Sequence, residues 1–233
     1  MAKSKHRKKT AVHAKDEAVV DQAILTIKNG LKWKREVKRE GNDYEIISYP
    51  ADRIHVITLP SQGKPEKLNE LHELCHAHFA EFIHPLFSGS GFYLGTEDGK
   101  IQACTGVLRS VTDWFVEEMQ HSLATGSYKR QLENDLNWFT GSLAQEPHTE
   151  TEYISTAAML CAQSKRYLNR EVKVDGELAI LTQTFLSVDP SNPTLEKLES
   201  LINKCLMALK QRIGRELQVE CVWDETEYVW KFI

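Results

Sequence analysis

Hydrophobic residues recur at steps of three and four along most of the chain, which is the spacing of one face of an α-helix. Between residues 66 and 83 the spacing predicts an amphipathic helix, with Leu71, Cys75 and Phe79 on its apolar side. The same pattern predicts six further helices, over residues 16–31, 104–124, 128–143, 149–168, 176–187 and 194–217. Most of the chain is therefore expected to be α-helical.

Shorter runs of β-branched and aromatic residues predict four strands. Residues 44–48 and 53–59 flank a turn that contains Pro50, and residues 218–223 and 228–233 are expected to form a terminal hairpin. The predicted fold class is α+β, mostly α, with a small antiparallel sheet and an α-rich C-terminal part.

Turn-forming residues suggest where the chain divides. Four glycines between Pro85 and Lys100 predict a flexible connection. Residues 1–14 are expected to be a disordered basic arm. Residues 15–126 contain the candidate chemistry described below, and residues 127–233 form the α-rich C-terminal region. These last two regions are either separate or one continuous domain.

Composition places the chain among ordinary globular proteins, with 41% hydrophobic and 27% charged residues in 233. No stretch approaches the roughly 18 apolar residues that a membrane helix needs. No apolar stretch follows the first Lys and Arg residues, so a secretory signal is not expected. Five cysteines, an odd number without a CxxC spacing, favour a reducing compartment. We therefore expect a soluble, cytoplasmic protein that does not enter membranes.

Positive charge is concentrated at the N-terminus. Residues 1–40 carry 12 Lys and Arg against 5 Asp and Glu, whereas the chain as a whole has a net charge of −4. Such an arm could contact nucleic acid through residues 1–14. This interpretation is not favoured, because no aromatic residue lies between Lys3 and Lys9 and no nucleic-acid motif follows.

One motif carries chemistry, the His-Glu-x-x-His of His72-Glu73-Leu74-Cys75-His76. Residues four apart lie on nearly the same helix face, so His72 and His76 can bind one metal ion. Glu73 is then close enough to act on a metal-bound water without being a ligand. This is the arrangement of a hydrolytic Zn²⁺ site. The motif arises by chance in about 3% of shuffled sequences, and the alternative is a helix with two partly buried histidines.

These residues resemble the active-site helix of the zincin metallopeptidases. The resemblance implies a zincin-like metal-binding region over residues 15–126, with the strand at 53–59 as the edge along which a substrate peptide lies. The metzincin branch is excluded, because Phe79 and Phe82 occupy the places of its Gly and its third His. His78 and His84 point in other directions from the helix than His76, so neither easily completes the metal site.

The resemblance to gluzincins and aspzincins implies that a second helix supplies a carboxylate as the third ligand. Asp113, Glu117 and His121 are spaced four apart and share one helix face. Asp113 is the expected ligand, and Glu117 is its partner or the alternative third ligand. The same spacing is similar to that of uncharacterised bacterial and phage metallopeptidase-like proteins. The main apolar stripe of this helix lies roughly opposite Asp113, so the alternative is a solvent-facing acidic stripe.

Other residues are weaker candidates. His121, Tyr93 and Tyr128 could each donate a hydrogen bond to an anionic transition state. Cys75 lies within the motif, but its place on the apolar stripe favours a buried structural thiol.

The expected function is therefore that of a zinc-dependent metallopeptidase. In this hypothesis a metal-bound water hydrolyses a peptide bond of a peptide or protein substrate, and Glu73 is the general base. The alternative is a catalytically silent, metal-stabilised interaction or regulatory protein, with the α-rich segment 128–217 as its partner-binding surface.

Overall fold

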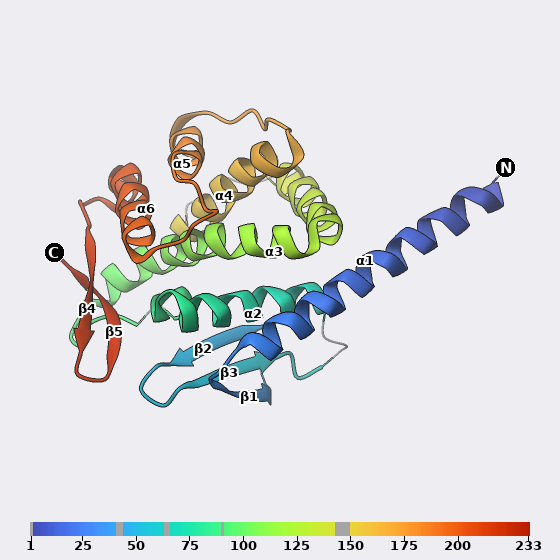
Figure 1. Cartoon of the computed structure of the whole chain (residues 1–233). Helices are drawn as coiled ribbons and strands as arrows, with labels where there is room; N and C mark the ends of the chain where they lie inside the picture. Colours follow the sequence, from blue (N-terminus) through green and yellow to red (C-terminus); the bar gives the residue numbers. More distant parts are fainter. Residues whose placement is uncertain (1, 41–43, 63–65, 90, 143–149) are drawn as a thin grey trace.

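The chain, described here from a computed structural model, is mostly α-helical with two small sheets (Figure 1), which confirms the predicted α+β class. The structure describes residues 2–40, 44–62, 66–89, 91–142 and 150–233. Its helices are α1 (Ala2–Gly30), α2 (Lys67–Phe82), α3 (Asp98–Ser142), α4 (Thr151–Leu168), α5 (Gly176–Leu186), α6 (Leu195–Ala208) and α7 (Lys210–Ile213), with a 3₁₀ turn at Pro85–Phe87. Its strands are β1 (Lys34–Arg39), β2 (Glu45–Tyr49), β3 (Ile54–Leu59), β4 (Val219–Asp224) and β5 (Glu227–Phe232).

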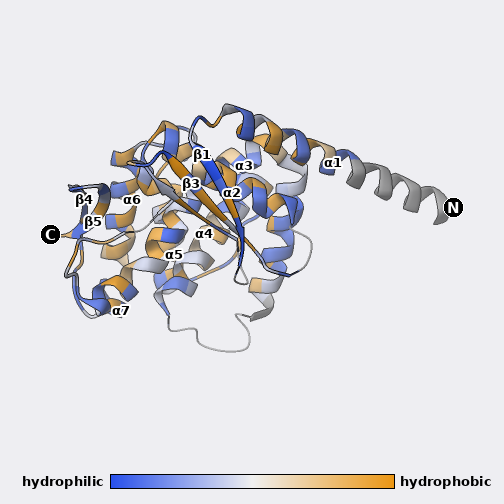
Figure 2. Ribbon diagram, turned by 90° about the horizontal axis from the view of Figure 1, so that it is seen from below, coloured by the Kyte–Doolittle hydropathy of each residue, from blue (hydrophilic) through white to orange (hydrophobic). Residues whose placement is uncertain are grey.

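The larger sheet has the strand order β1-β3-β2 and is mixed, not wholly antiparallel as expected. β2 pairs antiparallel with β3, whereas β1 pairs parallel with it. β1 escapes prediction because Val37 is its one apolar residue and its side chains are mostly exposed (Figure 2 shows it as hydrophilic). β3 is consequently the central strand, and the expectation that residues 53–59 form a substrate-binding edge is wrong. The predicted terminal hairpin is confirmed as β4 and β5.

Most predicted helices are confirmed, with two changes of boundary. The helices expected at 104–124 and 128–143 are the two arms of α3, which meet at Ala124, a residue with non-helical φ −139° and ψ 45°. α3 also begins at Asp98, within the connection that was expected to be flexible. The helix expected to reach residue 217 ends at Ala208, and α7 stops where Gly214 takes a left-handed φ of 77°.

Helix α1 also begins earlier than the predicted Asp16. It runs from Ala2, so its first turns include the segment for which disorder was expected. No Gly or Pro interrupts this segment, and its Ala, Lys and Arg residues have high helix propensity. The side chains of residues 1–14 lie outside those that the structure describes, and so does the proposed contact of this basic arm with nucleic acid.

One hydrophobic core joins the two regions expected on either side of residue 126. It runs from Val20 in α1 to Trp230 in β5 and includes residues of α2, α3 and α6. α3 is its central element, packing against α1, α2, α4 and α6 (Figure 1). No helix within the described ranges is both long and apolar enough to cross a membrane.

Helices α3 and α4 approach each other closely where Gly106 faces Glu152. A Cβ atom on Gly106 would lie 2.4 Å from the Glu152 Cα, so there is no room for a side chain unless the helices separate. We therefore expect Gly106→Ala to lower the free energy of unfolding by about 1–3 kcal/mol, the usual effect of overpacking. Urea denaturation measures the change.

Gly99→Ala is the matched control on the same helix. A Cβ atom there meets nothing closer than the end of the Arg215 side chain at 3.7 Å. Its stability should stay unchanged or rise slightly, because Ala favours helix over Gly. Equal stabilities for the two variants would contradict the close packing of α3 on α4.

Candidate metal centre

Helices α2 and α3 bring three potential metal ligands together. His72 and His76 lie one turn apart on α2, and Asp113 lies on the facing side of α3. The Nε2 atoms of the two histidines are 3.0 Å apart. Asp113 Oδ1 is 3.1 Å from His76 Nε2 and 3.4 Å from His72 Nε2. Within the described ranges this is the one group of three such residues that could hold a metal ion.

The three separations match those expected around a zinc ion. Tetrahedral ligands at about 2.05 Å from Zn²⁺ are about 3.3 Å from one another. Three protein atoms form one face of such a tetrahedron and leave its fourth corner free. The side chains of His72, His76 and Asp113 are 20%, 12% and 29% exposed, so the site is shielded but can be reached by solvent.

His76 is held in the tautomer that a ligand needs. Its Nδ1 donates a hydrogen bond to the Phe87 carbonyl oxygen 2.5 Å away, because that oxygen can only accept. In the neutral form of the ring the lone pair is therefore on Nε2, the atom that faces the acceptor Asp113 Oδ1. Two acceptors 3.1 Å apart are stable only with a proton or a metal ion between them.

The local fold explains why Phe87 is available for this contact. Pro85 starts a 3₁₀ turn directly after α2, and the His84 Nδ1 caps the turn by accepting from the Leu86 N–H. The Ser88 N–H closes the turn on the Pro85 carbonyl, which leaves the Phe87 carbonyl free to face α2.

The pKa shifts within the cluster favour a positive charge on His72 and a negative charge on Asp113. Burial lowers the pKa of the His72 imidazole, but the hydrogen bond with Asp113 and the negative charges around it raise that pKa to about 10. Burial raises the pKa of Asp113, but hydrogen bonds with both histidines hold it well below its usual range. Asp113 is therefore an anion across the physiological range, as a metal ligand must be.

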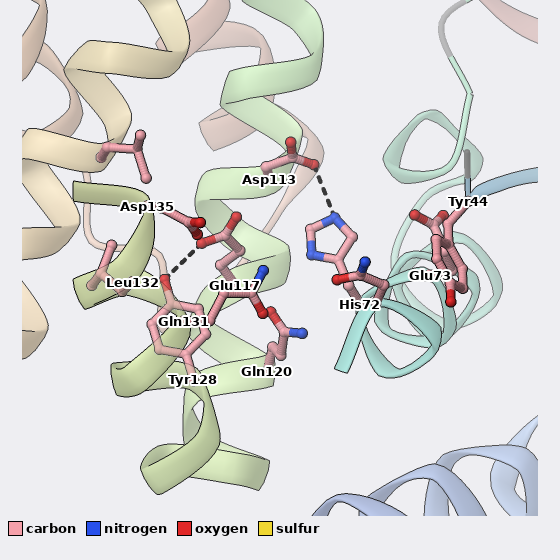
Figure 3. A pocket seen from close by; sticks show the side chains of 12 residues that line it. Tyr44, His72, Glu73, Asp113, Glu117, Gln120, Tyr128, Gln131, Leu132 and Asp135 are labelled. Carbon is pink, nitrogen blue, oxygen red and sulfur yellow. Dashed lines mark hydrogen bonds and ion pairs between the residues drawn. The ribbon is translucent and has the colours of Figure 1, made fainter. Parts of the chain in front are cut away.

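Glu117 does not join this triangle, although it lies one turn after Asp113. Its Oε2 accepts a hydrogen bond from the Tyr128 hydroxyl at 2.6 Å (Figure 3) and another from Gln163 Nε2 at 2.7 Å. Burial raises the pKa of Glu117 to about 7, and the nearby positive charge of His72 opposes this shift. Of the two candidate third ligands, the structure thus brings Asp113 to the histidines.

Two cavities meet at the cluster, and Glu73 lines both. The smaller, about 340 Å³, lies toward the second arm of α3 and α4, and the larger, about 890 Å³, lies toward the sheet. His72 and Asp113 also line both cavities. A group bound at the cluster would therefore have space on two sides, in cavities that Glu73 also lines.

The larger cavity is bordered by the edge strand β2. All five β2 residues line it, and β2 has β3 as its one strand neighbour in the sheet. Its outer backbone groups are thus available to an extended chain. The edge strand at this cavity is therefore β2 and not residues 53–59.

Several side chains that line these cavities were missed in the sequence, among them Tyr44, Arg109 and Tyr228. Tyr44 lines both, while Arg109 and Tyr228 line the larger one. Arg109 could have been found, because it lies one turn before Asp113 on the same face of α3. Tyr228 could not, since it reaches the site through a contact between distant segments, in which the Trp230 N–H bonds to the Gly91 carbonyl.

The remaining candidates lie apart from the cluster. His121 stacks on Tyr167 and lines neither cavity. Tyr93 is 42% exposed beside Lys231, whereas Tyr128 lines the smaller cavity. Cys75 is fully buried in the core, and burial raises the pKa of its thiol, which fits a structural role.

The acidic face of α3 is not a solvent-facing stripe. α3 is buried on several sides, since Trp114 packs on Phe185 and its indole donates to the Val188 carbonyl. The side bearing Asp113 faces the two histidines of α2. The apolar stripe opposite Asp113 is therefore compatible with a role for Asp113 as a ligand.

The geometry predicts different metal contents for two conservative variants. Asp113→Asn removes the anionic ligand, so protein purified without chelator should lose most of its bound metal. Glu117→Gln preserves the triangle and should retain about one ion per chain. Elemental analysis by plasma mass spectrometry measures both. Metal loss in Glu117→Gln but not in Asp113→Asn would show that the ligand is Glu117.

Known proteins provide no independent guide to this site. Comparison of the chain with protein-family models, with curated proteins and with solved structures gives no match. The chemistry of the cluster therefore has to be inferred from its own residues.

Proposed function

We propose that this chain is a zinc-dependent metallopeptidase. The observation that carries the proposal is the triangle of His72, His76 and Asp113, whose edges of 3.0–3.4 Å suit tetrahedral zinc. Two imidazoles and one carboxylate leave a coordination position open, which is the arrangement of catalytic rather than structural zinc sites. When bound, the ion would polarise the substrate carbonyl and make water nucleophilic near neutral pH.

Glu73 is the residue of the chain that would move the proton. Glu73 follows His72 directly in the sequence and lines both cavities together with it. In this proposal its carboxylate accepts a proton from the attacking water and then donates it to the leaving amine nitrogen. The same group thus serves as general base and general acid.

The edge strand β2 would position the substrate. An extended peptide can add to an exposed sheet edge through main-chain hydrogen bonds, which recognise peptides largely independently of sequence. Since β2 borders the larger cavity, a peptide bound there would pass beside the metal cluster. A peptide or protein is therefore the substrate class that the site supports best.

The test of this function is Glu73→Gln, which removes the proton acceptor and keeps the shape of the side chain. We expect normal metal content and a fall in kcat/KM by about 10²–10⁴-fold on any cleaved peptide. Fluorogenic peptide libraries identify a substrate for the wild-type protein, and plasma mass spectrometry confirms the metal.

Glu70→Gln is the matched control on the same helix, because Glu70 pairs with Lys28 and lines neither cavity. It should cleave like the wild type. A Glu73→Gln protein that cleaves as fast as the wild type would contradict the mechanism. Metal retention without cleavage of any peptide would favour the alternative, a metal-stabilised interaction or regulatory protein.

A further inference from the structure

The smaller cavity beside the metal cluster is rich in hydrogen-bond acceptors and negative charge. Beyond Glu73 and Asp113, the carboxylates of Glu117 and Asp135 line it, and Figure 3 shows these last two groups side by side. None of the described residues that line it is Lys or Arg. The four acidic side chains that line the cavity therefore outnumber its one basic side chain, His72, which pairs with Asp113.

Neither of these two carboxylates is saturated by the protein. Both hydrogen bonds to Glu117 end on its Oε2, and its Oε1 has no donor among the described side chains. Asp135 has neither a hydrogen bond nor an ion pair with any residue that the structure describes, although it is half-buried. These acceptor atoms line the cavity, where a bound ligand could supply the donors that the protein does not.

A buried amide provides a second, independent indication of the missing partner. Gln120 lines the same cavity and is only 3% exposed. Its Nε2 donates to the Leu68 carbonyl at 2.7 Å, which fixes the orientation of the amide because a carbonyl can only accept. The Oε1 of Gln120 is then another acceptor without a donor in the described part of the chain, and one N–H of its Nε2 remains as a donor.

A ligand that fits must therefore bring several donors and a positive charge. A second metal ion fits poorly, because Glu117 and Asp135 do not assemble with a third ligand into a metal-binding group within the described ranges. A lysine ammonium offers three donors and an arginine guanidinium five. Leu132 and Leu160 line the cavity as well and provide apolar walls for the aliphatic stem of either side chain.

We propose that this cavity binds a cationic side chain, so that the preferred substrate carries Lys or Arg next to the scissile bond. The statement about cleavage rests on the proposed peptidase function, whereas the statement about binding does not. Asp135 is the best residue with which to test binding separately from cleavage, because it lies outside the metal triangle and does not move the proton in the proposed mechanism.

The experiment uses the full-length, zinc-loaded protein and probes that differ only in one charge. In the first arm, calorimetry measures binding of acetyl-Ala-Lys-Ala-amide and of its norleucine counterpart. In the second arm, kcat/KM is measured for fluorogenic peptides with Lys, Arg, norleucine or Glu on either side of the cleaved bond. Asp135→Asn is compared with Glu133→Gln, a change at an exposed residue of α3 that does not line the cavity.

We expect the Lys probe to bind about tenfold more tightly than the norleucine probe, or better, as for hydrogen bonds to charged groups. Lys and Arg peptides should have a similar advantage in kcat/KM. Both ratios should fall towards one in Asp135→Asn and stay unchanged in Glu133→Gln, with thermal unfolding confirming that both variants fold.

The two arms distinguish failure of the inference from failure of the proposed function. Equal binding of the two probes, or no measurable binding of the Lys probe, overturns the cationic site. Cleavage without a preference for Lys or Arg also overturns it and leaves the peptidase intact. A binding preference that Asp135→Asn abolishes, in a protein that cleaves nothing, supports the site and overturns the peptidase.

Discussion

The packing of α2 against α3 is the constraint on which the site depends. It places an anionic carboxylate against two imidazole nitrogens, at 3.1 and 3.4 Å, from residues 37 or more positions apart in the sequence. Neither helix alone holds three ligands. Because α3 also packs on α4 and α6 through the common core, the position of Asp113 is set by the whole fold.

The surroundings of the cluster complete its geometry. The 3₁₀ turn after α2 orients His76 through the Phe87 carbonyl, and the two cavities on either side provide access. One cavity is bordered by a strand edge, which suits a peptide backbone, and the other by free acceptors, which suit a cationic side chain. A single bound peptide could therefore use both features at once.

Local periodicity was sufficient to predict part of this structure. The helix bearing His72 and His76 was predicted within two residues, and the four-residue spacing on α3 identified Asp113 before its surroundings were known. Helical spacing depends only on neighbouring residues, so the helix and the placement of Asp113 could be predicted, whereas its role as a metal ligand stays a prediction.

Features that depend on distant contacts could not be predicted. β1 is polar and exposed, so no hydrophobic pattern in the sequence indicates its pairing with β3. For this reason residues 53–59 were wrongly predicted to be the edge strand. Tyr228 and Asp135 approach the cluster from the terminal hairpin and the second arm of α3. Their positions beside the cavities follow from the tertiary packing and not from any local motif.

The most direct test of the central claim is X-ray absorption spectroscopy of the zinc-loaded protein at the zinc edge. The account predicts a four-coordinate ion with nitrogen and oxygen neighbours at about 2.0–2.1 Å and the outer-shell signal of two imidazoles. A sulfur neighbour at about 2.3 Å, or a spectrum without imidazole scattering, would contradict the assignment of His72, His76 and Asp113 as ligands.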